Sequence, residues 1–406
     1  MMFSATRTNV SAEKILVNTS FDGEKGGFTP KKQQNVVVKR GSLHPACKSQ
    51  QVFSTDKEVY SAFELPNQIV FFAWNGFSRI TDGKEEKIGS LQFTRPVYLH
   101  CQKQNALILS QKGEYTAMYT EEGVSTICNV GMESLALCKE RVVGVADNKV
   151  YFSDVDDFSS WNEITLPEKV CAVTQLQEDV LLFGKDVLRL NFGKDVADTT
   201  VETVCRNVGI PFAQTLCAVG NSVVYLTANG LMKFKNSSVT KLAEAFADNA
   251  EAQATVFGGK YVVCCNTEEQ KGVLLETDCE TGQSVVIGKA DFVTANGDRL
   301  LFGMDGKVCT FGEEKADAFW QSYPQSFGNA AAKKHLRKLT VDAVGSVEVR
   351  LIGEIDKKVF RMQCKNPQTV HLQGTFHKLT LEILTFGNAV VHSVGVLAEI
   401  FRLGEV

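Results

Sequence analysis

The stretch "NSVVYLTANGLMKFKNSS", Asn221 to Ser238, decides the fold. Two short runs of alternating β-type residues flank Asn229-Gly230, and Asn-Gly is the dipeptide that best suits the positive φ angles of a tight hairpin turn. Nearly the same layout recurs in "NQIVFFAWNGFSRITDG" (Asn67 to Gly83) and in "GDRLLFGMDGKVCTFGEE" (Gly297 to Glu314). The same hairpin pattern therefore recurs at distant places in the sequence.

Seven such central turns recur about 38 residues apart, a period typical of propellers and solenoids: Asn75-Gly76, Lys112-Gly113, Asp147-Asn148, Lys185-Asp186, Asn229-Gly230, a loop around Gln270 to Gly272, and Asp305-Gly306. Flanking turns divide each unit into four strands of about five residues, which is the blade of a β-propeller. Apolar quartets such as "IVFF" and "VVYL" suit inner strands buried on two sides. We expect about seven four-stranded blades, with six or eight still open because the boundary units are atypical.

The extent of the hairpin repeat divides the chain into three regions. We expect the propeller over residues 46–318 and a small antiparallel β-sandwich over residues 319–406, where the hairpin period ends but strand signals continue. Residues 1–45 are polar and Gly-rich before one strand, Val36 to Lys39, and suggest an extended N-terminal arm. Helical periodicity is confined to a turn or two near Lys241 to Ala252. The fold class is therefore all-β.

Composition narrows the class of protein. The 406 residues carry 43 basic and 47 acidic groups, so no general attraction to nucleic acid or to an anionic membrane follows. The N-terminus lacks the apolar region of a secretory signal, and no run approaches the roughly 18 apolar residues of a membrane span. Twelve cysteines are scattered through strand-like runs. We expect reduced, mostly buried thiols in a protein made in a cytosol.

No pattern of catalytic or metal-ligating residues emerges. The six histidines have no metal-ligand spacing with the cysteines, and no nucleophile elbow or catalytic triad is present. "GQSVVIGKA" (Gly282 to Ala290) lacks the spacing and the hydroxyl of a phosphate-binding loop. "SDVDDFSSW" (Ser153 to Trp161) begins like a calcium loop, but Phe158 stands where an oxygen ligand belongs. We expect no enzyme activity, no cofactor and no metal.

The one concentrated basic run is "KKHLRK", with Lys333, Lys334, Arg337 and Lys338. It is a candidate contact patch for phosphates or for an acidic partner surface. Aromatic residues do not interleave with it, so single-stranded nucleic acid is not favoured. A solvated strand entry in the C-terminal domain is the favoured explanation of the run.

Three phrases resemble those of phage tail and neck proteins. "QQNVVVKRGSLHPACKSQQVFS" (Gln33 to Ser54) resembles their N-terminal signature, with Asn35 before a strand and Gly41 in a turn. "NKVYFSDVDDFSSWNEI" (Asn148 to Ile164) is similar to their blade phrase, with matches at Ser153, Asp154 and Trp161. Its loop carries Val155 and Asp157 where Pro or Gly is common, which leaves the subfamily open. "YPQSFGNAAAKKHLRKLTVD" is similar to their exit from the propeller into a C-terminal β-domain.

The resemblance is to tail nozzle and packaged-DNA stabilisation proteins of short-tailed phages. It implies a structural virion protein, made in the bacterial host cytoplasm, that forms a hexameric ring below the portal and adaptor proteins. Such a ring retains the genome and later conducts it outward without sequence-specific binding. A propeller tolerates loop elaboration for such contacts.

Two other classes of function stay open. One is a soluble β-propeller scaffold that binds host proteins, although the Gly-His and Trp-Asp signatures of common propeller platforms are missing. The other is a propeller glycosidase or lyase, which would need several carboxylates or a metal on the inner strands. The inner strands offer almost none.

Overall fold

The structure is a computed structural model in which residues 10–18, 21, 30–39, 42–53, 55–73, 76–89, 91, 93–193, 196–243, 249, 251–267, 271–296, 299–327, 331–354 and 356–403 are described. Strands dominate these residues, and the helical elements among them are the short 3₁₀ turns η1 (Gln102–Gln104), η2 (Val196–Asp198) and η3 (Ala213–Thr215). The chain divides into two compact units: Ser49–Ser284 with Gly288–Phe311, and Met1–Lys48 with Val285–Ile287 and Gly312–Val406.

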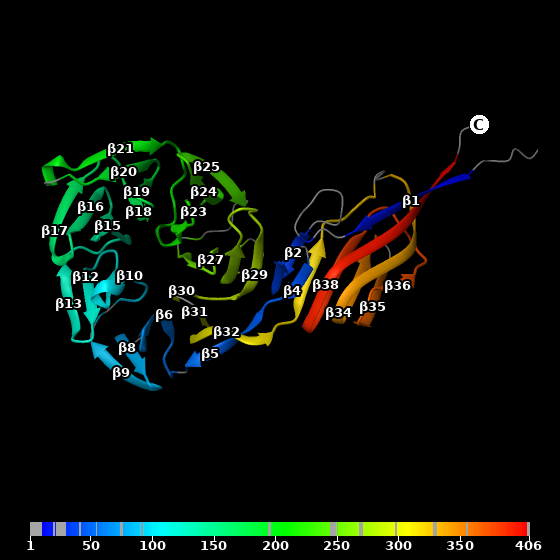
Figure 1. Cartoon of the computed structure of the whole chain (residues 1–406), viewed down its shortest axis with the longest axis horizontal. Coiled ribbons are helices and arrows are strands. Elements are labelled where there is room, and N and C mark those ends of the chain that lie inside the picture. Colours follow the sequence, from blue (N-terminus) through cyan, green and yellow to red (C-terminus); the bar gives the residue numbers. More distant parts are fainter. Residues whose placement is uncertain are drawn as a thin grey trace, which may run out of the picture. The chain divides into compact units, whose positions relative to one another are not determined.

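The larger unit is a propeller of four-stranded antiparallel blades arranged around an axis (Figure 1). Five blades follow chain order: β6–β9 (Val59–Leu65, Gln68–Ala73, Gly76–Thr81, Lys84–Gly89), β10–β13 (Val97–Cys101, Ala106–Ser110, Thr116–Thr120, Gly123–Cys128), β14–β17 (Ser134–Cys138, Arg141–Ala146, Lys149–Asp154, Asp157–Thr165), β18–β21 (Val170–Leu176, Asp179–Gly184, Val187–Asn191, Thr200–Cys205) and β22–β25 (Cys217–Val219, Ser222–Thr227, Gly230–Lys235, Ser238–Ala243).

The other two blades show how the ring closes. β26–β29 (Gln253–Phe257, Lys260–Cys265, Val273–Thr277, Ser284–Lys289) form the sixth. The seventh combines β30–β32 (Val293–Asn296, Arg299–Met304, Lys307–Lys315) with β5 (Cys47–Phe53), a strand from the other end of the propeller sequence. Consecutive inner strands pack against one another from β10 to β30, and β30 also packs against β6. The expectation of about seven four-stranded blades is confirmed.

The central turn of each repeat joins the second and third strands of its blade. Asp147 and Asp305 adopt positive φ angles of 53° there, and Gly230 adopts 123°, so the turn residues supply the left-handed backbone that such hairpins need. Asn75 lies outside the described residues. Lys241 to Ala243, the start of the weakly helical run, belong instead to strand β25, where pairing with β24 prevails over local propensity.

Hydrophobic clusters lie between neighbouring blades. One joins Phe63, Val70 and Phe72 of the first described blade to Leu107 and Tyr119 of the second, and comparable clusters join the later blades. The last cluster joins Leu301 and Val308 to Phe71, across the point of closure. The first four described blades thus bury both of their faces against their neighbours, which none could do alone.

The second unit is built around two long antiparallel strands, β34 (Lys334–Ile352) and β38 (Thr380–Leu403). Register shifts between Asp342 and Ala343 and between Val344 and Ser346 interrupt their pairing near the middle. One core cluster contains alternate residues from both halves, among them Leu339, Val341, Val347 and Val349. Further strands flank this ribbon: β33 (Ala318–Ser322), β35 (Lys357–Cys364), β36 (Gln368–His371) and β37 (Thr375–Phe376).

The N-terminal segment differs from the expected extended arm over residues 1–45. Its strands β1 (Val10–Asn18), β2 (Pro30–Gln34), β3 (Val36–Lys39) and β4 (Ser42–Pro45) belong to the same sheet as β38. β1 pairs along nine residues with the end of β38, from Val10–Leu403 to Asn18–Gly395. The segment belongs to this unit because pairing with distant strands satisfies its backbone N–H and C=O groups. Such long-range pairing cannot be predicted from the local sequence.

Candidate functional site

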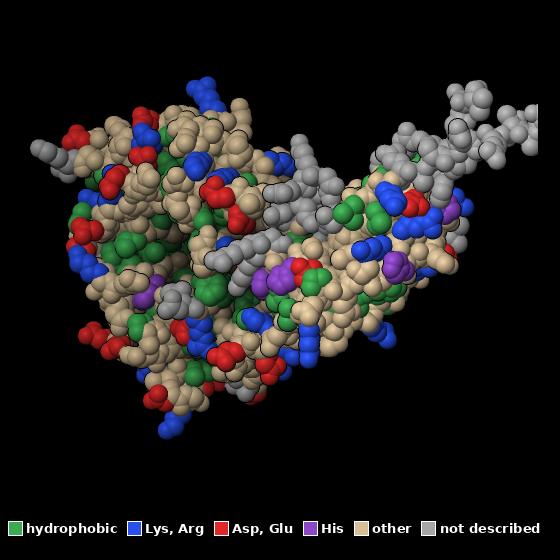
Figure 2. All heavy atoms as spheres, turned by 45° about the vertical axis from the view of Figure 1, so that its right-hand side comes forward, with side chains coloured by type: hydrophobic (Ala, Val, Ile, Leu, Met, Phe, Trp, Pro, Cys, Tyr) green, Lys and Arg blue, Asp and Glu red, His purple; other side chains and the backbone are tan. Residues whose placement is uncertain are grey.

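The inner strands of the propeller enclose a cavity of about 490 Å³. Figure 2 shows a hollow on this face of the propeller with hydrophobic side chains on its wall. All seven inner strands contribute to the lining, for example through Phe63, Tyr98, Ser134, Thr174, Cys217, Thr255 and Thr294. Because each blade presents the same edge to the axis, residues distant in sequence meet in one place.

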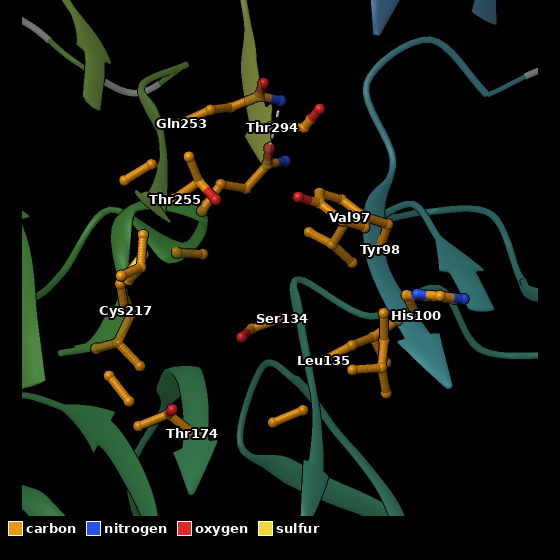
Figure 3. A pocket seen from close by; sticks show the side chains of 18 of the residues that line it. Val97, Tyr98, His100, Ser134, Leu135, Thr174, Cys217, Gln253, Thr255 and Thr294 are labelled. Carbon is orange, nitrogen blue, oxygen red and sulfur yellow. Dashed lines mark hydrogen bonds between the residues drawn. The ribbon is translucent and has the colours of Figure 1, made fainter. Parts of the chain in front are cut away.

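Uncharged polar groups face this cavity. Tyr98 and Thr255 direct their oxygens toward the same space in Figure 3. Nearby, Gln253 Nε2 donates a 2.6 Å hydrogen bond to Gln214 Oε1, and Gln214 Nε2 donates to the Arg95 carbonyl at 3.4 Å. These bonds fix the two amides side by side at the wall of the cavity.

Other lining groups serve the fold. Ser134 Oγ accepts a 3.1 Å hydrogen bond from the Val173 amide, and Thr294 Oγ1 donates a 2.9 Å bond to the Ala62 carbonyl. Each of these bonds links one blade to the next at the axis. The cavity wall is therefore held in place by polar contacts between blades as well as by their apolar cores.

The cavity is electrically neutral in its lining. None of the described residues that line it is Asp, Glu, Lys or Arg. Desolvation raises the pKa of Tyr98 to about 12 and that of Cys217 to about 12, and it lowers the pKa of His100. His100 Nε2 is buried and has no hydrogen-bond partner among the described residues. The surroundings thus favour the uncharged form of every titratable group at the wall.

An aromatic pair forms part of the wall. The rings of Phe63 and Tyr98 have centroids 4.3 Å apart with a 43° angle between their planes. The phenol of Tyr98 therefore presents a packed apolar ring and a hydroxyl group to one space.

The residues of the blade phrase form one corner of a blade. Ser153 is fully buried, and its Oγ accepts a 3.0 Å bond from the Val142 amide and donates a 2.9 Å bond to the Asp154 carbonyl. Trp161 lies opposite Ser153 in the β16–β17 ladder, and its Nε1 donates to the Phe158 carbonyl at 2.8 Å.

Asp154 and the loop beyond it complete this corner. Asp154 Oδ1 accepts a 3.2 Å bond from Asn162 and lies 3.6 Å from Arg141 Nη1. Asp156, in the loop that begins like a calcium site, adopts a φ of 57° and pairs with Lys103 at 2.6 Å. The whole phrase positions strands, which agrees with its interpretation as a turn.

Asn35 is also a structural residue. It adopts a φ of 53° between β2 and β3, its amide nitrogen donates to the Val286 carbonyl at 2.7 Å, and its side chain donates to the Asp317 carbonyl at 3.1 Å. One residue thus ties the N-terminal strands to two other segments of their unit. Gly41, the other residue of this signature, lies outside the described residues.

The basic run does not form the expected patch. Lys333 is exposed, but Lys334 is fully buried and its Nζ donates to the His377 carbonyl at 3.1 Å. Arg337 pairs with Glu399 at 2.7 Å, and Lys338 is half-buried. Lys334 is therefore corrected from a contact residue to a core residue. It has the same parity along β34 as the buried Leu336, a signal that the sequence already contained.

The described residues contain neither a cluster of metal ligands nor a membrane-spanning helix. Their His, Cys, Asp and Glu side chains form no group of three or more that could hold a metal ion. No helix among them is long and apolar enough to cross a membrane. All twelve cysteines are free thiols, and eight of them are buried.

Comparisons with known proteins add structural likeness only. No family model matches the chain, and no curated protein matches it. Among solved structures, it is similar to the extracellular domain assigned to a one component system from B. thetaiotaomicron, with 11% identity, a TM-score of 0.49 and coverage of 81% of this chain and 48% of that one. PorZ, a surface component of the type-IX secretion system of Porphyromonas gingivalis, follows with 13% identity, a TM-score of 0.46 and coverage of 77% and 46%.

The chain is also similar to the AfRom2 CNH domain, with 8% identity, a TM-score of 0.48 and coverage of 65% of this chain and 99% of that domain. The chain spans about half the length of the two bacterial surface proteins. At these scores and identities the likenesses carry no functional argument. The resemblance to phage tail proteins therefore stays a hypothesis.

Proposed function

We propose that this chain is a non-enzymatic structural protein of a phage tail or neck, which assembles into a ring that retains the genome and conducts it during ejection. The observation that carries the proposal is the pairing of a closed propeller with a second β-unit that contains both ends of the chain. This arrangement matches the order of domains that the three phrases imply. Asn35, Ser153 and Trp161, the matched positions, all hold strands together, as residues of an architectural family should.

Unpaired strand edges support self-assembly. Among the described residues, β1 pairs only with β38, and β35 pairs only with β34, so each presents backbone groups on its other side. Leu16 on β1 is 61% exposed and Val359 on β35 is 46% exposed. A ring needs two different surfaces on each subunit that meet head to tail, and two sheet edges with exposed apolar residues are suitable.

The genome would pass through the lumen of the ring. The propeller cavity is small and lined by packed side chains, so it is no path for a duplex. Partners would be further copies of the chain, the portal-side adaptor and other tail proteins, with DNA in transient passage and without sequence-specific contacts. We propose six copies, by resemblance to the nozzle family.

The test is assembly of the purified full chain. We expect light scattering after size exclusion to give a hexamer at micromolar concentration, and negative-stain averages to show a six-fold ring. Leu16→Asp on the β1 edge should shift the protein toward monomer, whereas Val155→Asp, on an exposed propeller turn, should not.

Antibodies against the chain should also label tails of intact particles. Protein that stays monomeric at every concentration and is absent from particles would reject the proposal. If the monomer then captured only cellular proteins, the scaffold alternative would take its place.

A further inference from the structure

We propose that the propeller cavity is a binding site for a neutral hexopyranose, an uncharged sugar of one or two rings. The inference goes beyond the structural role above and does not depend on it, because every residue involved lies within the propeller unit. It rests on the volume, polarity and shape of the wall described for the cavity.

Volume comes first. A cavity of about 490 Å³ lies within the roughly 300–1,000 Å³ of small-molecule sites. Its wall comes from seven different blades, which are locked by inter-blade hydrogen bonds such as Ser134–Val173 and Thr294–Ala62. A site of this kind is preformed, so binding costs little ordering of the protein.

Charge selects the ligand class. With no Asp, Glu, Lys or Arg among the described lining residues, a phosphate, carboxylate or ammonium would lose its hydration without a countercharge. A purely apolar ligand fits no better. Gln253 donates one bond to Gln214, and the Tyr98 hydroxyl bonds to Thr255 and to the Ala295 backbone, but the remaining donor and acceptor sites of these groups would be covered without water. A neutral ligand with many hydroxyl groups avoids both penalties.

Shape narrows the choice further. A pyranose has an apolar C–H face and a rim of hydroxyls that donate and accept. The half-buried ring of Tyr98, which packs on the buried Phe63, is suited to the first. The hydroxyls of Tyr98 and Thr255 and the Gln253–Gln214 amide pair are suited to the second. Aromatic surface and uncharged hydrogen-bonding groups thus converge on one space.

The experiment uses the purified full chain and saturation-transfer NMR followed by calorimetry. The neutral probes are glucose, galactose, N-acetylglucosamine and maltose, and the matched anions are glucose 6-phosphate and glucuronic acid. We expect at least one neutral probe to bind, and its anionic counterpart to bind at least about tenfold more weakly. Absence of binding by all four neutral probes, or equal binding by the anions, would overturn the proposal.

Two variants locate the site. Thr255→Val keeps the shape of the side chain but removes its hydroxyl, and we expect affinity to fall about three- to tenfold, the factor that one hydrogen bond supplies. Thr126→Val, on an exposed outer strand, is the matched control and should bind as the wild type does. Thermal melting checks that both variants are folded. Unchanged affinity in folded Thr255→Val would place any sugar elsewhere and refute the assignment.

Discussion

Substituting Ser153 with Ala tests whether the blade phrase is a structural corner. The Ser153 Oγ is the acceptor for the Val142 amide at 3.0 Å, and both residues have no exposed surface. Ala would leave that buried N–H without a partner and would also remove the 2.9 Å donation to the Asp154 carbonyl. An unsatisfied buried donor costs about 1–3 kcal/mol. We therefore expect the free energy of unfolding to fall by about 2 kcal/mol.

Thermal unfolding followed by circular dichroism measures this change. For a unit of this size, about 2 kcal/mol corresponds to a decrease of roughly 4–8 °C in Tm. Ser125→Ala, at an exposed position of outer strand β13, is the matched control and should leave Tm within about 1 °C, since exposed substitutions are typically neutral. If Ser153→Ala and Ser125→Ala melt together, the argument from the buried hydrogen bond is refuted.

Three further predictions follow from backbone approach, charge and burial. Gly184→Ala should destabilise the propeller by about 2 kcal/mol or more, because a Cβ there would lie 2.5 Å from the Lys169 carbonyl, whereas Gly288→Ala meets no atom within 4 Å and should melt like the wild type. Hydrogen bonds from Arg361 and Arg350 lower the pKa of Glu348, so its contribution to stability is present above the unfolded pKa and is lost as pH falls through the folded pKa. Urea titrations should show that the free energy of unfolding of Glu348→Gln falls less steeply below about pH 4.5 than that of the wild type. The same pH dependence in both proteins below about pH 4.5 would contradict this. Burial raises the pKa of the Cys138 thiol to about 12, whereas Cys205 is half-exposed. After iodoacetamide treatment at pH 8, mass spectrometry should find Cys205 alkylated in the native protein and Cys138 alkylated only after unfolding. Labelling of Cys138 in the native protein would disprove its burial.

The blades were predictable because their information is local. A turn such as Asn229-Gly230 fixes the hairpin between β23 and β24 from adjacent residues alone. Repetition then fixes the architecture, since a four-stranded sheet that cannot cover its own faces must stack on a copy of itself. The same reasoning predicted a β-domain after residue 318, whereas the second compact unit resumes at Gly312.

Long-range pairings were not predictable in this way. The sequence "CKSQQVF" does not predict that β5 completes a blade whose other strands begin at Val293. Likewise, the sequence of β1, "VSAEKILVN", does not identify Gly395–Leu403 as its partner in the ladder. Such pairings are decided by which backbone edges remain free when the rest has folded, and a single sequence does not record them.

The candidate cavity could not be predicted from the sequence for a related reason. Tyr98 and Thr255 are separated by more than 150 residues and carry no motif, so only the closed ring places their oxygens at one space. A search for carboxylates and metal ligands could not detect a site whose defining property is the lack of charge. Motif searches favour sites built on charged or metal-ligating chemistry, and a neutral site is visible only from packing.

Closure through β5 joins the two ends of the propeller sequence in one blade. Six blades are continuous in sequence, but the seventh holds the start and the end of the propeller together by backbone hydrogen bonds and by the cluster of Phe71, Leu301 and Val308. The first and last strands of the propeller sequence therefore lie side by side in one blade, so the ring closes by strand pairing as well as by side-chain packing.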